Sequence, residues 1–362
     1  MKTKMFTLIL GLLFFGSNSF AKIFRVGYTG TPLAGVDYTF QDAVSNASAG
    51  DTIQIYDGGG GVSGSVDKKL VILGFGFNLD VHPGLQVLNS DQPSYASIYL
   101  KSGSDGTFIS GITGIFSIGE NYSSGTLSNI TIERCNATVQ ISDYISGYAV
   151  KDIYINRCVV SFSLTHAPPY SQPVKNLQLN NCIINGEISL YDPGTTAFIT
   201  NCVTLNGAGS YLNLRDAQVL VKNCIIYSHD YYNTNTNTIY ENNFFGESQP
   251  NPLPPGSNNR WGQDWTTIFN RLGGTDDLPG YPGQTVFDEN YYLLKSGSPA
   301  KNGGFDANNN PTDCGIFGGE AAYKYIVSGI PPIPAIYQLT PPADPKVTTN
   351  PYNVTISVRS NN

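Results

Sequence analysis

Five cysteines recur at nearly constant spacing in the middle of the chain, and each ends a short segment of alternating apolar and polar residues. The intervals between successive cysteines are 23, 24, 20 and 22 residues. The segments that they close are residues 129–135, 152–158, 176–182, 196–202 and 218–224. An alternation of period two is typical of a β-strand with one buried face. The repeat therefore predicts one such strand about every 22 residues.

The short distance between the copies restricts how these strands can be connected. About 15 residues without a helical pattern separate them, which is too few for the helical crossover of a βαβ unit. A chain that coils so that each strand stacks on its predecessor, ~4.8 Å along the axis, satisfies the spacing. The predicted fold is an all-β, single-stranded parallel β-helix, in which equivalent residues form ladders.

The residue before each cysteine is expected at a bend between two strands. Arg134 and Arg157 occupy this position first, and asparagines follow in later copies. An asparagine amide can bond its own turn and the next asparagine of the stack. We align a sixth copy with Asn243 at the bend and Phe244 after it. Glu241 then falls at an apolar position, so the regular stack is expected to end there.

The segment before the repeats suggests how the helix starts. Residues 35–50 place Phe40, Ala43, Val44 and Ala47 at helical spacing, and we expect this amphipathic helix to cover the first coil. The order of this helix, the step Ala-Gly-Asp-Thr-Ile at 49–53 and the coil Leu-Val-Ile-Leu-Gly at 70–74 resembles that of pectate-lyase-like proteins. The resemblance implies a right-handed helix, as parallel crossovers generally favour, and is weak for function.

The start of the chain has the features of a secretory signal. Two lysines within residues 1–4 precede the apolar stretch 5–15, and small and polar residues lead to Ala21. We therefore expect residues 1–21 to be a signal peptide and the protein to be exported to the periplasm, the cell surface or the medium. A net charge of -7 and only 13% charged residues argue against a nucleic-acid partner.

The C-terminal third has a different composition. Prolines cluster from Pro250 onward, and the steps Ser-Pro-Ala at 298–300 and Asp-Cys-Gly-Ile-Phe-Gly-Gly at 313–319 resemble the closing segment of bacterial exported β-helix proteins. We expect the β-helix over residues 22–245, and the final coils and a cap on its end over 246–328. Residues 329–362 are expected to form a proline-rich linker and a terminal strand.

The cysteines are interpreted as a core ladder rather than a chemical site. Stacked side chains that point the same way fit poorly to a disulfide dihedral near 90°, and no zinc-type spacing is present. Cysteine also behaves as a small buried apolar residue. Cys314 lies outside the repeat, and the histidines at 82, 166 and 229 share no position in it. No metal site or cofactor is predicted.

The outward strand positions supply the candidate ligand-binding residues. One row carries the aromatic residues Tyr154, Phe198 and Tyr240, and the neighbouring row carries Asn156 and Asn180. Aromatic rings stack on sugar rings while amides bond the hydroxyl groups. A covering loop explains the same apolar residues without any ligand, so both interpretations stand.

A catalytic alternative uses the charged residues near the first bends. Arg134 and Arg157 would stack about 5 Å apart and need an anion between them, either an internal carboxylate such as Glu133 or Asp152 or the acidic group of a polysaccharide. The four residues are the candidates for a lyase-like site, with calcium expected only in that case. The carboxylate patterns of lyases and glycosidases are missing.

Three functions follow. The leading hypothesis is an exported protein whose elongated face binds glycans or another cell-envelope component. The alternative is a polysaccharide lyase or another carbohydrate-active enzyme that acts on an acidic polysaccharide. The third is a structural adhesin whose strand over 354–358 docks to a partner.

Overall fold

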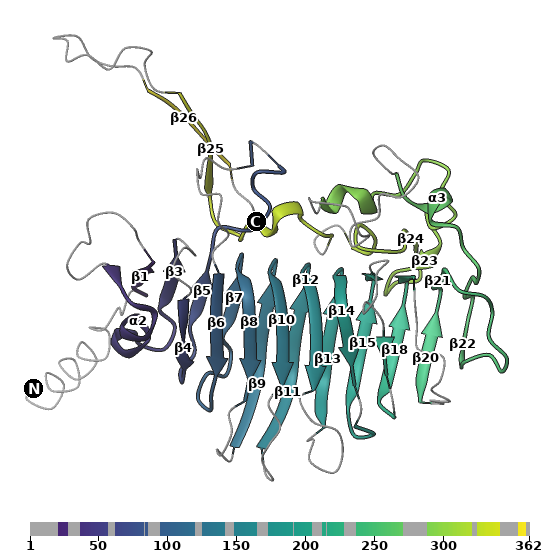
Figure 1. Ribbon diagram of the computed structural model, residues 1–362, viewed down its shortest axis with the longest axis horizontal. Coiled ribbons are helices and arrows are strands. Elements are labelled where there is room, and N and C mark those ends of the chain that lie inside the picture. The colour runs from purple at the N-terminus through teal and green to yellow at the C-terminus, as the bar shows by residue number, and fades with distance from the viewer. Residues whose placement is uncertain are drawn as a thin grey trace, which may run out of the picture.

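The computed structural model describes residues 21–27, 37–56, 62–82, 84–85, 95–119, 125–141, 148–164, 173–190, 192–204, 212–214, 216–227, 237–270, 288–320, 324–340 and 354–359. Their strands stack side by side along one axis (Figure 1). A 12-stranded sheet and a 10-stranded sheet, paired in parallel throughout, run the length of this stack. The predicted fold class, an all-β right-handed parallel β-helix, is confirmed. Most of residues 1–21, the expected signal peptide, lie outside the described residues.

Most coils contribute one strand to each sheet. The larger sheet, sheet A, contains β2 (Asp37–Tyr38), β1 (Ile23–Val26), β3 (Thr52–Ile55), β5 (Val71–Leu73), β7 (Phe108–Ser110), β9 (Gly125–Glu133), β11 (Tyr148–Asn156), β13 (Val174–Asn180), β15 (Thr196–Thr200), β18 (Gln218–Lys222), β20 (Thr238–Glu241) and β22 (Gly256–Ser257). The second, sheet B, contains β21 (Phe244–Phe245), β19 (Ile225–Ile226), β16 (Val203–Thr204), β14 (Ile183–Ser189), β12 (Val159–Leu164), β10 (Asn136–Ile141), β8 (Thr113–Ile118), β6 (Tyr95–Leu100), β4 (Val62–Val66) and β17 (Leu212–Asn213).

The ladders predicted from the repeat are present in the strand register. Ile130 pairs with Ile153, which pairs with Leu177, and the column continues through Ala197 and Val219. These side chains are buried. Burial of these side chains fixes the register, because a slip of one residue would turn all of the inward apolar side chains of a strand outward.

The bend between the two sheets has a left-handed backbone. Arg134, Arg157, Asn181, Asn201, Asn223 and Asn242 have φ angles between 52° and 56°. Asparagine is one of the few side chains that tolerates this conformation. Its recurrence at the bend therefore has a backbone reason that the sequence analysis did not consider.

The sixth coil is aligned one residue earlier than predicted. Thr238 pairs with Val219 and Glu241 with Lys222, so Asn242 rather than Asn243 lies at the bend. Asn243 then takes the place of a cysteine, and its Oδ1 accepts a hydrogen bond of 2.8 Å from the Cys224 N–H. The placement of Glu241 at an inward position was wrong. The stack continues through β22, which pairs with β20.

The five repeated cysteines form the predicted buried column. All six are free and buried, and the Cys182 N–H donates to the Cys202 sulfur at 3.4 Å, as Cys202 does to Cys224. Burial raises the pKa of the Cys158 and Cys202 thiols well above the usual value, because a thiolate there would lose its hydration. These thiols are structural groups that stay protonated.

A short helix forms within residues 35–50, where the sequence predicted one, and it follows β2 in the chain. Helix α2 (Phe40–Asn46) is capped by the Thr39 side chain, which accepts from the Asp42 N–H at 3.2 Å. Its buried residues Phe40, Ala43 and Val44 join the main core. The helix lies at the N-terminal end of the stack (Figure 1).

The chain after β22 turns back and runs along the side of the helix (Figure 1). This C-terminal segment, residues 264–330, holds α3 (Trp265–Ile268), the 3-10 helices η1 (Glu289–Tyr292) and η3 (Val327–Gly329), and the pair β23 (Gly304–Phe305) and β24 (Pro311–Thr312). A second apolar cluster joins it to the outer face of sheet B. That cluster includes Val159, Ile183, Val203, Ile225, Phe244, Trp265, Ile268, Tyr292, Cys314 and Ile316.

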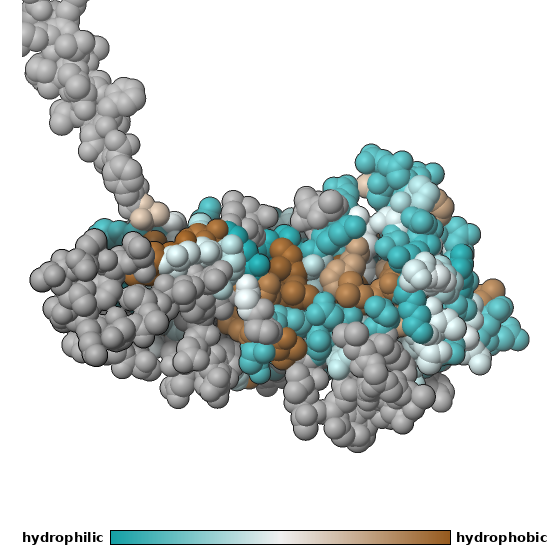
Figure 2. Space-filling view, turned by 90° about the horizontal axis from the view of Figure 1, so that it is seen from above, coloured by the Kyte–Doolittle hydropathy of each residue, from teal (hydrophilic) through white to brown (hydrophobic). Residues whose placement is uncertain are grey.

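The closing segment was expected to pack on the end of the β-helix, but its described residues 264–270, 288–320 and 324–330 run along the side instead. From Cys158 onward, the residue after each bend cysteine is apolar and belongs to this second cluster. The strip must be covered to be removed from water. Figure 2 looks down on this side, where apolar patches lie along the middle between hydrophilic residues. The Trp261 ring, which precedes the turn, stacks on Phe245 at 3.9 Å between ring centroids.

The last described strands form a hairpin that stands off the stack (Figure 1). Strand β26 (Thr355–Arg359) pairs antiparallel with β25 (Ala335–Thr340). The predicted terminal strand thus pairs within its own segment, and Val354, Ile356 and Val358 are exposed. None of the helices in the described part of the chain has the length and hydropathy needed to cross a membrane.

Candidate functional site

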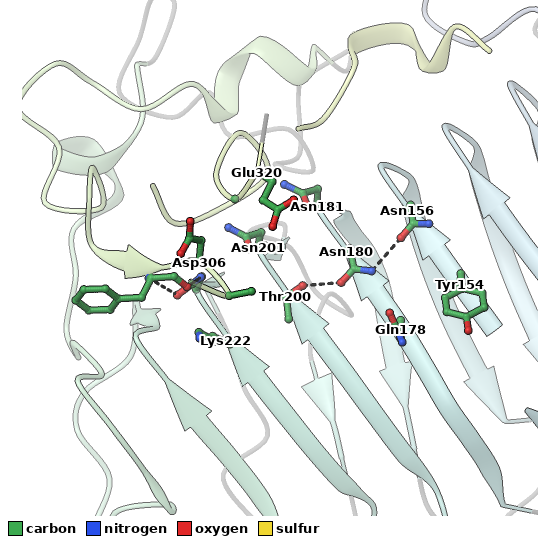
Figure 3. Close-up of a pocket in the computed structure, with 14 residues that line it drawn as sticks. Tyr154, Asn156, Gln178, Asn180, Asn181, Thr200, Asn201, Lys222, Asp306 and Glu320 are labelled. Atoms are coloured by element: carbon green, nitrogen blue, oxygen red, sulfur yellow. Dashed lines mark hydrogen bonds between the residues drawn. The ribbon is translucent and has the colours of Figure 1, made fainter. Parts of the chain in front are cut away.

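A groove of about 500 Å³ lies between the outward face of sheet A and the C-terminal segment. Strands β11, β13, β15 and β18 supply its floor, with side chains Tyr154, Asn156, Gln178, Asn180, Thr200 and Lys222. The bend supplies Asn181, Asn201 and Asn223. The C-terminal segment supplies Phe305, Asp306, Ala307, Gly319 and Glu320. The floor therefore crosses four successive coils (Figure 3).

The floor carries a chain of hydrogen bonds from coil to coil. The Asn180 amide donates to Asn156 Oδ1 at 3.0 Å, and the Thr200 hydroxyl donates to Asn180 Oδ1 at 2.6 Å (Figure 3). An amide group has two donor hydrogens and two acceptor lone pairs. After these bonds Asn180 keeps one donor and one acceptor position, and its side chain lines the groove.

The bend asparagines hold the C-terminal segment in place. The Asn181 amide donates to the carbonyl oxygens of Ile316 and Gly318 at 2.8 and 2.9 Å. The Asn223 side chain donates to the Phe305 carbonyl at 2.9 Å and accepts from the Phe305 N–H at 3.2 Å. A weaker bond of 3.3 Å joins Asn201 to the Asp313 carbonyl. One side of the groove is therefore held by the bend asparagines. From the sequence, these amides were expected to bond their own turns and one another.

The approach of the segment to this row requires a glycine. A Cβ on Gly304 would lie 2.4 Å from Asn223 Oδ1, too close for any non-bonded contact. Gly304 therefore allows the two hydrogen bonds between Asn223 and Phe305 to form.

The charged side chains of the groove are one lysine and two carboxylates. Lys222 comes from β18, and Asp306 and Glu320 come from the C-terminal segment. The Asn310 and Asn308 backbone N–H groups donate to Asp306 Oδ1 at 2.7 and 2.9 Å. These hydrogen bonds lower the pKa of Asp306, and those from Asn310 are the largest cause. Asp306 is thus held as an ion and does not suit the role of a general acid.

The aromatic row is only partly as predicted. Tyr154 and Gln178 line the groove, and Phe198 pairs with Gln178 on the same outward row, is 42% exposed, and lies outside the groove lining. The outward position of Tyr240 was wrong. Because the sixth coil is aligned one residue earlier, Tyr240 pairs with Val221 and is buried, and Ile239 takes its place on the surface.

The four candidate catalytic residues do not form one site. Glu133 Oε1 lies 3.0 Å from Arg134 Nε and 2.6 Å from Arg157 Nη2, so this carboxylate is the internal partner of both guanidinium groups. Arg134 is buried and also donates to the Ile330 carbonyl at 2.9 Å. Burial lowers the pKa of Arg134, and the charge of Glu133 opposes this shift. Asp152 lies in β11, four residues before Asn156, and bonds the Asn176 amide.

The sequence analysis missed the half of the groove that comes from the C-terminal segment. Asp306 and Glu320 are far from Lys222 in the chain, and no local pattern connects them. Two of the histidines considered, His166 and His229, lie outside the described residues.

Comparisons with known proteins do not assign this site. No protein-family model matches the chain, and a search of curated proteins finds no match.

Proposed function

We propose that the protein is an exported glycan-binding protein and that the groove on sheet A holds a linear, neutral polysaccharide. The observation that carries this proposal is the bonded row Asn156–Asn180–Thr200 on the groove floor beside Tyr154. Export is supported by the signal-like residues 1–21.

The spacing of the floor suits a polymer. Equivalent side chains repeat every ~4.8 Å along the axis, so a chain of sugars meets a new amide or hydroxyl with each coil. Amide groups exchange hydrogen bonds with sugar hydroxyls in either direction. The Tyr154 ring offers a face for the C–H side of one sugar.

The charge of the groove favours a neutral ligand. Its lining contains two carboxylates and one lysine among the described residues, and a uronic-acid polymer would bring further negative charge. The arginines expected to bind such a polymer are paired with Glu133 instead. No observation specifically favours the lyase alternative.

The test is affinity electrophoresis against neutral polysaccharides, such as xylan, mannan and β-glucan, and against polygalacturonate. At least one neutral polymer should retard the protein, and Tyr154→Ala and Asn180→Ala should each weaken binding about tenfold. That factor corresponds to about 1.4 kcal/mol, the scale of one stacking or hydrogen-bonding contact.

Phe198→Ala is the matched control, because it removes an outward aromatic ring of the same row that lies outside the groove lining. It should leave binding unchanged. Equal losses for Phe198→Ala and Tyr154→Ala, tighter binding of polygalacturonate, or release of shortened sugars from any polymer would each contradict the proposal.

A further inference from the structure

A second group of polar residues lies away from the groove, where the early coils meet the C-terminal segment. His82 Nε2 is 2.9 Å from Glu289 Oε2 and 3.5 Å from Asp288 Oδ1. The three potential ligand atoms all lie within 4.8 Å of one another. The side chain of Glu289 is fully buried, and those of His82 and Asp288 are 9% and 19% exposed.

Each of the three side chains is held by a further partner. The Ser328 N–H donates to Glu289 Oε1 at 2.9 Å, and this directs Oε2 toward His82. The Asn290 N–H donates to Asp288 Oδ1 at 2.8 Å, and the Asn290 amide contacts His82 Nδ1 at 3.4 Å. Metal ligands in proteins are usually oriented by such outer hydrogen bonds.

The charge of the group is unbalanced without a cation. Two carboxylates face one imidazole, and within the described residues neither carboxylate is paired with a lysine or arginine. A carboxylate removed from water is costly unless a positive charge or a metal accompanies it.

We propose that His82, Asp288 and Glu289 form a binding site for one divalent cation of the zinc type. One imidazole and two carboxylates suit zinc, and three protein ligands leave a fourth position for water. Tetrahedral ligands at 2.0–2.2 Å from zinc stand about 3.4 Å apart. The 3.5 Å between His82 and Asp288 fits this value, and His82 and Glu289 must separate by about 0.5 Å.

The site has a structural role that is independent of glycan binding. It joins residues 207 positions apart in the chain and fastens η1 to the loop after β5. A cation that binds the folded chain alone stabilises it by mass action.

The experiment uses the full chain after treatment with EDTA, titrated with Zn²⁺ by calorimetry and followed by thermal unfolding. We expect one Zn²⁺ per chain and a rise in Tm of about 3–5 °C at a hundredfold excess over Kd. Asp288→Asn, which keeps a side chain able to cap η1, should bind at least tenfold more weakly and lose most of the Tm rise. His82→Gln should do the same.

Two controls separate this site from other sources of binding. Asp306→Asn alters an acidic residue in the groove and should leave zinc binding unchanged. Co²⁺ in place of Zn²⁺ should show no thiolate charge-transfer band, since the cysteines are not ligands. No bound Zn²⁺ in the wild-type chain, full binding by both Asp288→Asn and His82→Gln, or a thiolate band would overturn the proposal.

Discussion

Replacing Glu133 with glutamine is expected to lower the free energy of unfolding by about 3–5 kcal/mol. The substitution keeps the shape of the side chain and removes the carboxylate shared by Arg134 and Arg157. Two guanidinium groups on adjacent coils then repel each other, and Arg134 is a buried charge. Urea unfolding followed by circular dichroism measures the change.

Glu241→Gln is the matched control for this experiment. Glu241 belongs to the row that contains Glu133, Asn156, Asn180, Thr200 and Lys222, and within the described residues it takes part in no ion pair. The change in stability should stay within about 0.5 kcal/mol. Similar losses for the two variants would show that the shared carboxylate is not the cause.

Asn223→Ala is expected to lower stability by about 2–4 kcal/mol. It removes both side-chain bonds to Phe305, each worth about 1 kcal/mol, and leaves alanine at a φ of 56°, which costs about 1–2 kcal/mol. Residues 304–318 should exchange their amide hydrogens faster, because the row that holds them is interrupted.

Asn223→Gly separates the two contributions. Glycine adopts the left-handed backbone without strain, so this variant should be more stable than Asn223→Ala by about 1 kcal/mol and show the same faster exchange over residues 304–318. Wild-type exchange in both variants would contradict the assigned role of Asn223 in holding the segment.

The local features of the fold could be predicted from the sequence. The inward columns, the buried cysteines and the helix at 40–46 each follow from a period that is visible within a few residues. The alignment failed where the repeat itself changed. The sixth copy has Asn243 in place of a cysteine. Because Phe244 was aligned with the cysteines instead, Tyr240 was predicted on the surface, whereas it is buried in the core.

The groove could be predicted only in part, because half of it depends on contacts distant in sequence. Tyr154, Asn156 and Asn180 could be found, since an outward position follows from strand alternation. The path of the C-terminal segment could not. Asn223 bonds a residue 82 positions later, and no periodicity relates the two. For the same reason, the sequence around His82 does not indicate that Asp288 and Glu289, more than 200 positions later, lie beside it.

The measurement that tests the coil most directly is the reaction of the thiols with a disulfide reagent, before and after unfolding in guanidinium chloride without reductant. Every surface assigned above depends on cysteines that stack in one dry column. The folded protein should show almost no reaction, and the unfolded chain should show six thiols. Fewer than six thiols after unfolding, or rapid reaction of the folded protein, would contradict the column and the groove built beside it.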